Sequence, residues 1–159
     1  MEQIRNVNGK LLRCGYTTGA CAAAAAKAAG ITLFCGTPVD RVSITTPKGI
    51  VLTLDVLDIQ LTDYYASCAI RKDSGDDPDV TDGTLIFARV ERISHGITID
   101  GGKGVGRVTK PGLDQPVGAA AINSVPREMI TGELLKVAEK YGYHGGFSVI
   151  ISIPCGEEL

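Results

Sequence analysis

Residues 13–30 read Arg13-Cys-Gly-Tyr-Thr-Thr-Gly-Ala-Cys-Ala-Ala-Ala-Ala-Ala-Lys-Ala-Ala-Gly30, a run of small side chains near the N-terminus. Alanine is the strongest helix former, so this run predicts a helix. Either Thr17 or Thr18 can cap its start, because a threonine hydroxyl accepts a hydrogen bond from a backbone N–H of the first turn. Gly30 supplies a left-handed stop. The helix is therefore expected over roughly Gly19–Ala29.

The start of this helix lacks the acidic residues that usually face the positive end of a helix dipole. Its first turn holds Gly19, Ala20, Cys21 and Ala22, which leaves that end available to an outside anion. The methyl-sized side chains also let a sheet, another backbone or a flat ligand approach closely. Composition alone favours a simpler alternative, in which this is a buried helix packed tightly on a sheet.

The totals describe one domain, or one domain with the opening of a second, in 159 residues. Hydrophobic residues make up 44% and charged residues 21%, which excludes a disordered chain. The net charge of −2 gives no general attraction to nucleic acid or to a membrane surface. A polyanionic ligand must therefore be held by local basic groups.

Further features predict a cytoplasmic protein. No stretch approaches the ~20 apolar residues of a membrane span, and Met1-Glu-Gln-Ile-Arg5 lacks the apolar core of a signal peptide. The five cysteines are odd in number and have no C-x-x-C spacing, which indicates reduced thiols rather than disulfides or a zinc site.

Alternation of apolar and polar residues predicts most of the strands. Val39–Thr46 and Ile50–Leu57 flank Pro47-Lys-Gly49, which fits the type I turn of a β-hairpin. Further strands are expected at Tyr64–Arg71, Leu85–Ile93 and Phe147–Ile153.

Helical signals return near the C-terminal end, after a long glycine-rich loop expected over Gly96–Gly118. Pro126 is placed to open a short helical turn. Thr131–Gly142 is a second clear helix, ended by its glycine. This order predicts an α+β domain, with a largely antiparallel sheet and helices packed on one face. Residues 1–153 would form it, and residues 154–159 would be the truncated start of a following segment.

Two loops carry residues that could bind ligands. The acidic run Asp73–Gly83 fails the calcium-loop template, because Thr81 and Asp82 occupy the places of a ligand and the glycine. By itself it is better explained as a turn. The run Gly101–Gly112 fails both common nucleotide-loop patterns. Its basic residues and backbone amides suit either an anion nest or a solvated hairpin tip.

The sequence allows no assignment of nucleophile, acid and base. His95 and His144 are the only histidines, and each is more often an ordinary loop residue than a general base. The helix dipole would favour the thiolate of Cys21, although an inert thiol packed among alanines is the simpler explanation. Catalytic residues therefore stay unknown, and no resident metal is expected.

Four ordered motifs resemble the CbiD family, the cobalt-precorrin-5B (C1)-methyltransferases of anaerobic cobalamin biosynthesis. They are the 13–30 stretch, Asp76-Asp-Pro-Asp-Val-Thr-x-Gly83, the segment from Val108 to Ile130, and the start of a further motif at Pro154-x-Gly-Glu-Glu158. The resemblance implies the N-terminal domain of a longer two-domain enzyme. It also implies transfer of the methyl group of S-adenosylmethionine to C1 of cobalt-precorrin-5B, giving cobalt-precorrin-6A, with cobalt present only as part of the substrate.

The resemblance and the anion-binding features together give a set of substrate- and cofactor-binding candidates. A ligand carboxylate is placed at the N-terminus of the Thr18 helix, and basic side chains are placed at the macrocycle periphery. Asp77 or Asp79 would bind a ribose hydroxyl or steady the sulfonium, and Tyr16 would either lie against the sulfonium or simply pack. The candidates are Tyr16, Thr17, Thr18, Gly19, Cys21, Asp77, Asp79, Lys103, Arg107, Lys110, Asn123 and Arg127.

Two other functions are alternatives to this hypothesis. The chain could be a non-catalytic binding or assembly domain of such an enzyme, presenting its sheet to a partner domain or a second subunit. A phosphate-handling small-molecule kinase is disfavoured, because the nucleotide-loop templates fail. The expected partner is a cobalt-corrinoid intermediate, with no nucleic acid and no membrane, and a homo-oligomer is left open.

Overall fold

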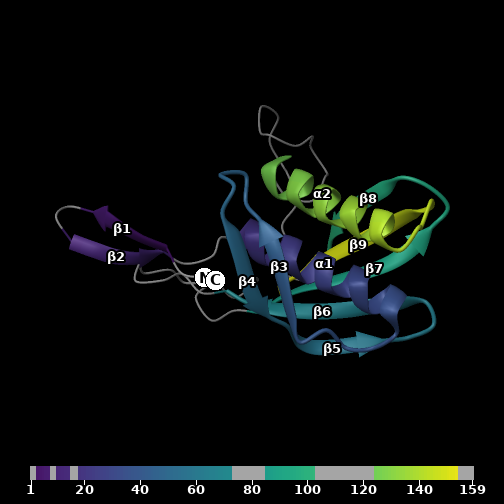
Figure 1. The fold of residues 1–159 in the computed structure, drawn as a ribbon. Coiled ribbons are helices and arrows are strands. Elements are labelled where there is room, and N and C mark those ends of the chain that lie inside the picture. The colour runs from purple at the N-terminus through teal and green to yellow at the C-terminus, as the bar shows by residue number, and fades with distance from the viewer. Residues whose placement is uncertain (1–2, 8–9, 15–17, 73–84, 103–123, 154–159) are drawn as a thin grey trace.

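A computed structural model describes residues 3–7, 10–14, 18–72, 85–102 and 124–153 of the chain. The N-terminal strands β1 (Gln3–Val7) and β2 (Lys10–Cys14) pair with each other as an antiparallel hairpin. The remaining elements form an α+β fold, which confirms the predicted fold class (Figure 1).

The alanine-rich helix α1 covers Thr18–Cys35, so it is longer than the predicted Gly19–Ala29. Gly30 does not end it, and the prediction of a stop there is wrong. A Cβ added to Gly30 would lie 2.9 Å from Cδ2 of Leu134, so the glycine instead lets a second helix approach. The left-handed residue that follows the helix is Gly36, with φ +73°.

Five strands form the main sheet, in the order β5-β6-β7-β9-β8. All neighbours are antiparallel except β8 and β9, which are parallel. The strands are β5 (Leu57–Leu61), β6 (Tyr65–Arg71), β7 (Leu85–Ile93), β8 (Ile97–Gly101) and β9 (Gly146–Ser152). The β6, β7 and β9 strands confirm the predictions within about one residue.

Four of the described strands were missed: β1 and β2, which precede α1, and β5 and β8 of the main sheet. Part of the predicted loop Gly96–Gly118 is β8, whose alternating Ile97 and Ile99 are flanked by glycines that hide the strand pattern. The predicted hairpin strand Ile50–Leu57 is shorter, because β4 covers Val51–Asp55 and Leu57 begins β5. Its partner β3 covers Arg41–Thr45, and Gly49 N–H donates to Thr46 O at 2.9 Å, which confirms the predicted turn.

The second helix, α2, covers Ser124–Lys140 without a break. The sequence predicted a separate turn before a helix starting at Thr131, but Gly132 is tolerated inside α2. Tertiary packing outweighs the local cost of that glycine, because Ile130 and Leu134 on either side of it are fully buried. The prediction that Gly142 ends the helix is confirmed by its φ of +64°.

The helix α1 lies at the centre of the fold, between the main sheet, α2 and the β3–β4 hairpin (Figure 1). Its burial therefore has no single face: every alanine of α1 is buried. Both helices lie on one face of the main sheet, as predicted.

By length and composition alone, α1 could cross a membrane, so the expectation that no segment approaches a span is wrong for this helix. Most of it, 67%, is buried inside the fold. A helix that is apolar all round is also what the core of a soluble domain requires, so this finding is weak evidence for a span.

Candidate functional site

The two helices run parallel and begin side by side. A Cβ on Gly19 would lie 2.7 Å from Cγ of Pro126, so the first turns of α1 and α2 are in close contact. Gly30, near the other end of α1, contacts Leu134 and Val137 of α2 in the same way. Neither of these two described helices has an acidic residue in its first turn, so their positive dipole ends reinforce each other.

Strand ends meet the helix starts at this end of the fold. The end of β6 pairs with the start of β7 through Arg71 and Leu85, and the ends of β8 and β9 pair through Gly101 and Ile151. The guanidinium of Arg127 in α2 donates to Ile99 O of β8 at 3.2 Å, which joins the helix start to the sheet. We call this region the helix-start end, made by the described residues 18–22, 71–72, 85–87, 99–102, 124–128 and 151–153.

Four of the predicted site residues are described, and three of them lie on the surface of the helix-start end. Thr18, Gly19 and Arg127 are half-buried there, on the first turns of the two adjacent helices. Cys21 has 0% exposure. That burial favours the packing interpretation of its thiol over contact with a ligand.

The other candidates lie outside the described residues. They are Tyr16, Thr17, Asp77, Asp79, Lys103, Arg107, Lys110 and Asn123. The described residues that flank them in the chain are Cys14, Thr18, Lys72, Leu85, Gly102 and Ser124, and all of these except Cys14 belong to the helix-start end.

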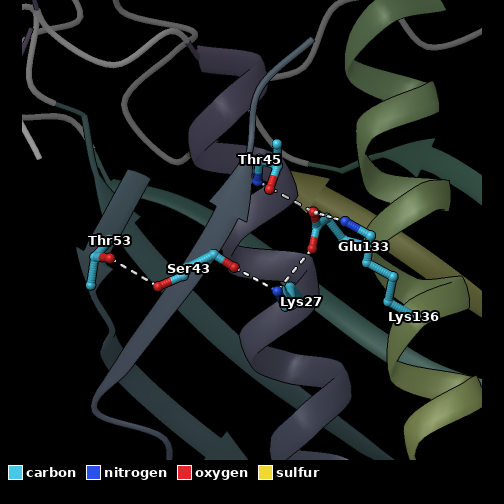
Figure 2. Close-up of polar contacts among 6 residues, drawn as sticks. All are labelled: Lys27, Ser43, Thr45, Thr53, Glu133 and Lys136. Carbon is cyan, nitrogen blue, oxygen red and sulfur yellow. Dashed lines mark hydrogen bonds and ion pairs between the residues drawn. The ribbon is translucent and has the colours of Figure 1, made fainter. Parts of the chain in front are cut away.

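Ion pairs around one buried carboxylate lie at the joint of α1, α2 and β3, and the sequence did not reveal them. Glu133 Oε2 lies 2.9 Å from Lys27 Nζ, in a geometry that is not a hydrogen bond, and Glu133 Oε1 lies 3.3 Å from Lys136 Nζ (Figure 2). The Glu133 side chain is 4% exposed. Lys27 Nζ also donates to Ser43 O at 2.6 Å, and Thr45 N–H donates to Glu133 Oε1 at 3.5 Å. One signal was available, since Lys27 is the one charged residue of α1.

A groove of about 270 Å³ between β3 and α2 carries four cations. Lys27 and Lys136 are already paired with Glu133, and Arg41 is paired with Asp55 at 3.0 Å. Because most of these positive charges are already paired, the groove is a weak anion site. Its lining residues are Lys27, Ile31, Arg41, Val42, Ser43, Lys136, Val137 and Lys140.

The described part of the chain offers little side-chain chemistry. Burial raises the pKa of the Cys68 thiol to about 11, although a contact with the Thr32 hydroxyl lowers it slightly. Both histidines are exposed. His95 follows the end of β7 and His144 precedes the start of β9, so both lie opposite the helix-start end. Among the described residues, no group of His, Cys, Asp and Glu could hold a metal ion.

Comparison with known proteins gives consistent similarities. The CbiD family model matches residues 5–159. The chain is 56% identical over its whole length to a cobalt-precorrin-5B C(1)-methyltransferase of Ruminiclostridium cellulolyticum, of which it covers 41%. It is 50% identical to the protein of the same name from Thermoanaerobacter sp. (strain X514), of which it covers 43%.

The fold is also similar to a crystal structure of a cobalamin biosynthesis protein (cbiD) from Archaeoglobus fulgidus, with a TM-score of 0.66 and 28% sequence identity. That match covers 98% of this chain and 48% of the crystallised one. The chain thus spans about two fifths of the length of the curated relatives that it matches.

Proposed function

The chain belongs to the CbiD family, and on that premise we propose that it is the N-terminal part of an enzyme that methylates C1 of cobalt-precorrin-5B. In this proposal the methyl donor is S-adenosylmethionine, the product is cobalt-precorrin-6A, and cobalt belongs to the substrate. Curated relatives carry the name of this methyltransferase.

One observation supports a binding role for the helix-start end: two parallel helices begin side by side where the strand ends of the main sheet meet them. Each helix start is equivalent to about half a positive charge. Arg127, half-buried on the first turn of α2, adds a full positive charge. Such an end attracts anions, and a corrinoid precursor with acetate and propionate side chains is an anion, as is the carboxylate of S-adenosylmethionine.

The described residues fit one part of S-adenosylmethionine, because helix starts and a guanidinium suit its carboxylate. When bound, this donor supplies an electrophilic methyl group on a sulfonium. The chain then has to hold two reactants in line and keep water away, which is equivalent to an effective concentration of roughly 10⁵–10⁸ M. We assign no acid or base among the described residues, and alignment does not require one.

The remaining candidates complete the proposed site from segments that join the helix-start end. Lys103, Arg107 and Lys110 would contact the macrocycle carboxylates, together with Arg127. Asp77 or Asp79 would contact the ribose or the sulfonium. Thr17, Asn123 and Tyr16 would line the same ligands.

Calorimetry tests this proposal. The chain is titrated with S-adenosylhomocysteine and with a cobalt-corrinoid precursor, at low and at high salt. We expect binding that weakens with salt, because the proposed contacts are ionic. Arg127→Met should weaken it about tenfold, as expected for a lost charge-assisted hydrogen bond. The matched Arg92→Met, on β7 at the opposite end, should not. Equal affinities in wild type and Arg127→Met would refute the assignment of Arg127.

A second candidate function is a non-catalytic binding or assembly domain of the same enzyme. The observation that favours it is the coverage, since 59% of the length of the first relative lies outside this match. The same titration distinguishes the two candidate functions. A binding or assembly domain predicts that this chain binds neither ligand, while a longer family member binds both.

A further inference from the structure

The alanine surface of α1 is poorly suited to fix its own position along α2. Ala22, Ala23, Ala24, Ala25 and Ala26 are consecutive and 4% exposed or less. Identical methyl groups present nearly the same surface after the helix slides by one turn or rotates by one residue. Along this alanine stretch, packing alone therefore distinguishes weakly between neighbouring registers of α1.

The described helix pair has few contacts that are specific to one register. The apolar ones are Gly19 against Pro126, Gly30 against Leu134 and, beyond the alanines, the ring of Phe34 stacked on that of Tyr141. The polar one joins the single charged residue of α1 to a carboxylate of α2 that is almost completely buried. This charged pair tolerates sliding poorly, because moving α1 takes Lys27 away from the buried carboxylate of Glu133 and leaves that carboxylate with the more exposed Lys136 alone.

The same pair also ties the helices to the unpaired edge of β3. Lys27 donates to Ser43 O, and Glu133 accepts from Thr45 N–H, so two side chains replace the donor and the acceptor of a neighbouring strand (Figure 2). The hairpin, α1 and α2 are thus locked at one point. A slip of α1 by one turn would break both contacts of Lys27, with Ser43 and with Glu133, and would move Thr18 by about 5.4 Å relative to Ser124.

We propose that Lys27 and Glu133 are positioning residues, which fix the register of α1 against α2 and so align the two helix starts that hold the ligand. Buried ion pairs contribute little net stability relative to apolar residues of similar volume, and their best-attested use is to specify one packing arrangement. The part of this inference that concerns the ligand rests on the proposed function, whereas the part that concerns the register does not.

The test replaces the pair with apolar residues, Lys27→Met with Glu133→Leu. The matched control makes the same kinds of change at an exposed ion pair of the hairpin, Arg41→Met with Asp55→Leu. Three properties are measured: the melting temperature, the nuclear Overhauser contacts of Gly19 with Pro126 and of Gly30 with Leu134, and the affinity for S-adenosylhomocysteine.

We expect the buried-pair variant to melt cooperatively at or above the wild-type temperature. It should lose the two helix–helix contacts or show a second set of resonances, and its affinity should fall at least about tenfold. The control should keep all three properties. Wild-type contacts with a single set of resonances in the buried-pair variant would overturn the proposal for the register.

Altered contacts with wild-type affinity would overturn the proposal for ligand alignment. If wild type itself does not bind, the proposed function fails, and the contacts alone decide on the register. Should the double variant not fold, Glu133→Gln is used, because it keeps the shape and removes only the charge. A second set of resonances in Glu133→Gln would then support the proposal, and a wild-type spectrum would overturn it.

Discussion

The two ends of the α1–α2 pair are built from opposite kinds of side chain. At the helix-start end the contact is between Gly19 and Pro126, with alanines behind it. At the other end, which we call the aromatic end, Phe34 of α1 lies 5.3 Å from Tyr141, 5.1 Å from Tyr143 and 6.0 Å from Phe147, measured between ring centroids.

This difference separates stability from binding. Large rings bury much apolar surface and have preferred geometries, so they hold the helices to the sheet. Tyr143 adds polar contacts, because its hydroxyl lies 2.9 Å from Ile93 O and 2.8 Å from Gly146 O. Small residues bury little surface but let backbone and helix dipoles come close to a ligand. We therefore expect changes at the aromatic end to affect folding alone, and changes at the helix-start end to affect binding together with a smaller effect on folding.

The largest effect is expected from Phe147→Ala. Its ring is 1% exposed and contacts both Phe34 and Tyr143, so truncation leaves a cavity in the core. The free energy of unfolding should fall by about 3–5 kcal/mol, measured by urea denaturation. Ligand affinity, measured where the variant is still folded, should stay at the wild-type value. A large loss of affinity in the folded variant would break the separation of the two ends.

The next effect concerns the buried interface that α1 makes with the sheet between the two ends. Cys68 of β6 has 0% exposure and lies under Thr32 of α1, and its pKa of about 11 exceeds the ordinary 9.0. The folded state thus holds the thiol proton more tightly than the unfolded state. The resulting stability is fully present below about pH 9 and is lost between about pH 9 and 11, by roughly 2–3 kcal/mol.

Comparison of wild type with Cys68→Ala isolates the contribution of the Cys68 thiol to stability. The difference between their free energies of unfolding should be constant at neutral pH and should change between pH 9 and 11. At pH 8 the exposed Cys35 should react with a thiol reagent while Cys68 does not. Rapid modification of Cys68 in the folded protein would show that water reaches this interface.

A smaller effect is expected from Gly19→Ala. The new Cβ would meet the rigid ring of Pro126 at 2.7 Å, so the helix starts must separate. We expect a loss of about 1–3 kcal/mol in the free energy of unfolding and weaker ligand binding. The control is Gly132→Ala, where no described atom lies within 4 Å of the new Cβ. It should stabilise the fold by up to about 1 kcal/mol, through helix propensity. Equal stabilisation by both substitutions would contradict the close contact.

Sequence patterns predicted the elements that follow local rules. The hairpin turn at Pro47-Lys-Gly49 and the strand Leu85–Ile93 depend on turn chemistry and on alternation, so they were found. Gly30 was misread, because its role is set by Leu134, more than a hundred residues away. Local propensity cannot distinguish a glycine that ends a helix from one that admits a neighbour.

The candidate site was predictable only in part. The absence of acidic residues at the first turn of α1 is visible in the sequence, but the parallel start of α2 beside it is a result of tertiary packing. The ion pair of Lys27 with Glu133 joins residues on two helices far apart in the chain, so no motif contains it. The predicted boundary after residue 153 and most candidate side chains stay predictions, because they lie outside the described residues.

The most direct measurement uses Thr18→Asp, which places a negative charge on the first turn of α1. A carboxylate there favours the helix, so the free energy of unfolding should stay equal or rise by up to about 1 kcal/mol. The same carboxylate repels a ligand anion, so the affinity for S-adenosylhomocysteine or the corrinoid precursor should fall by about tenfold, which is about 1.4 kcal/mol. The control is Thr53→Asp, on the exposed face of β4, which should leave affinity unchanged. Wild-type affinity in Thr18→Asp would contradict the claim that the helix-start end binds the ligand.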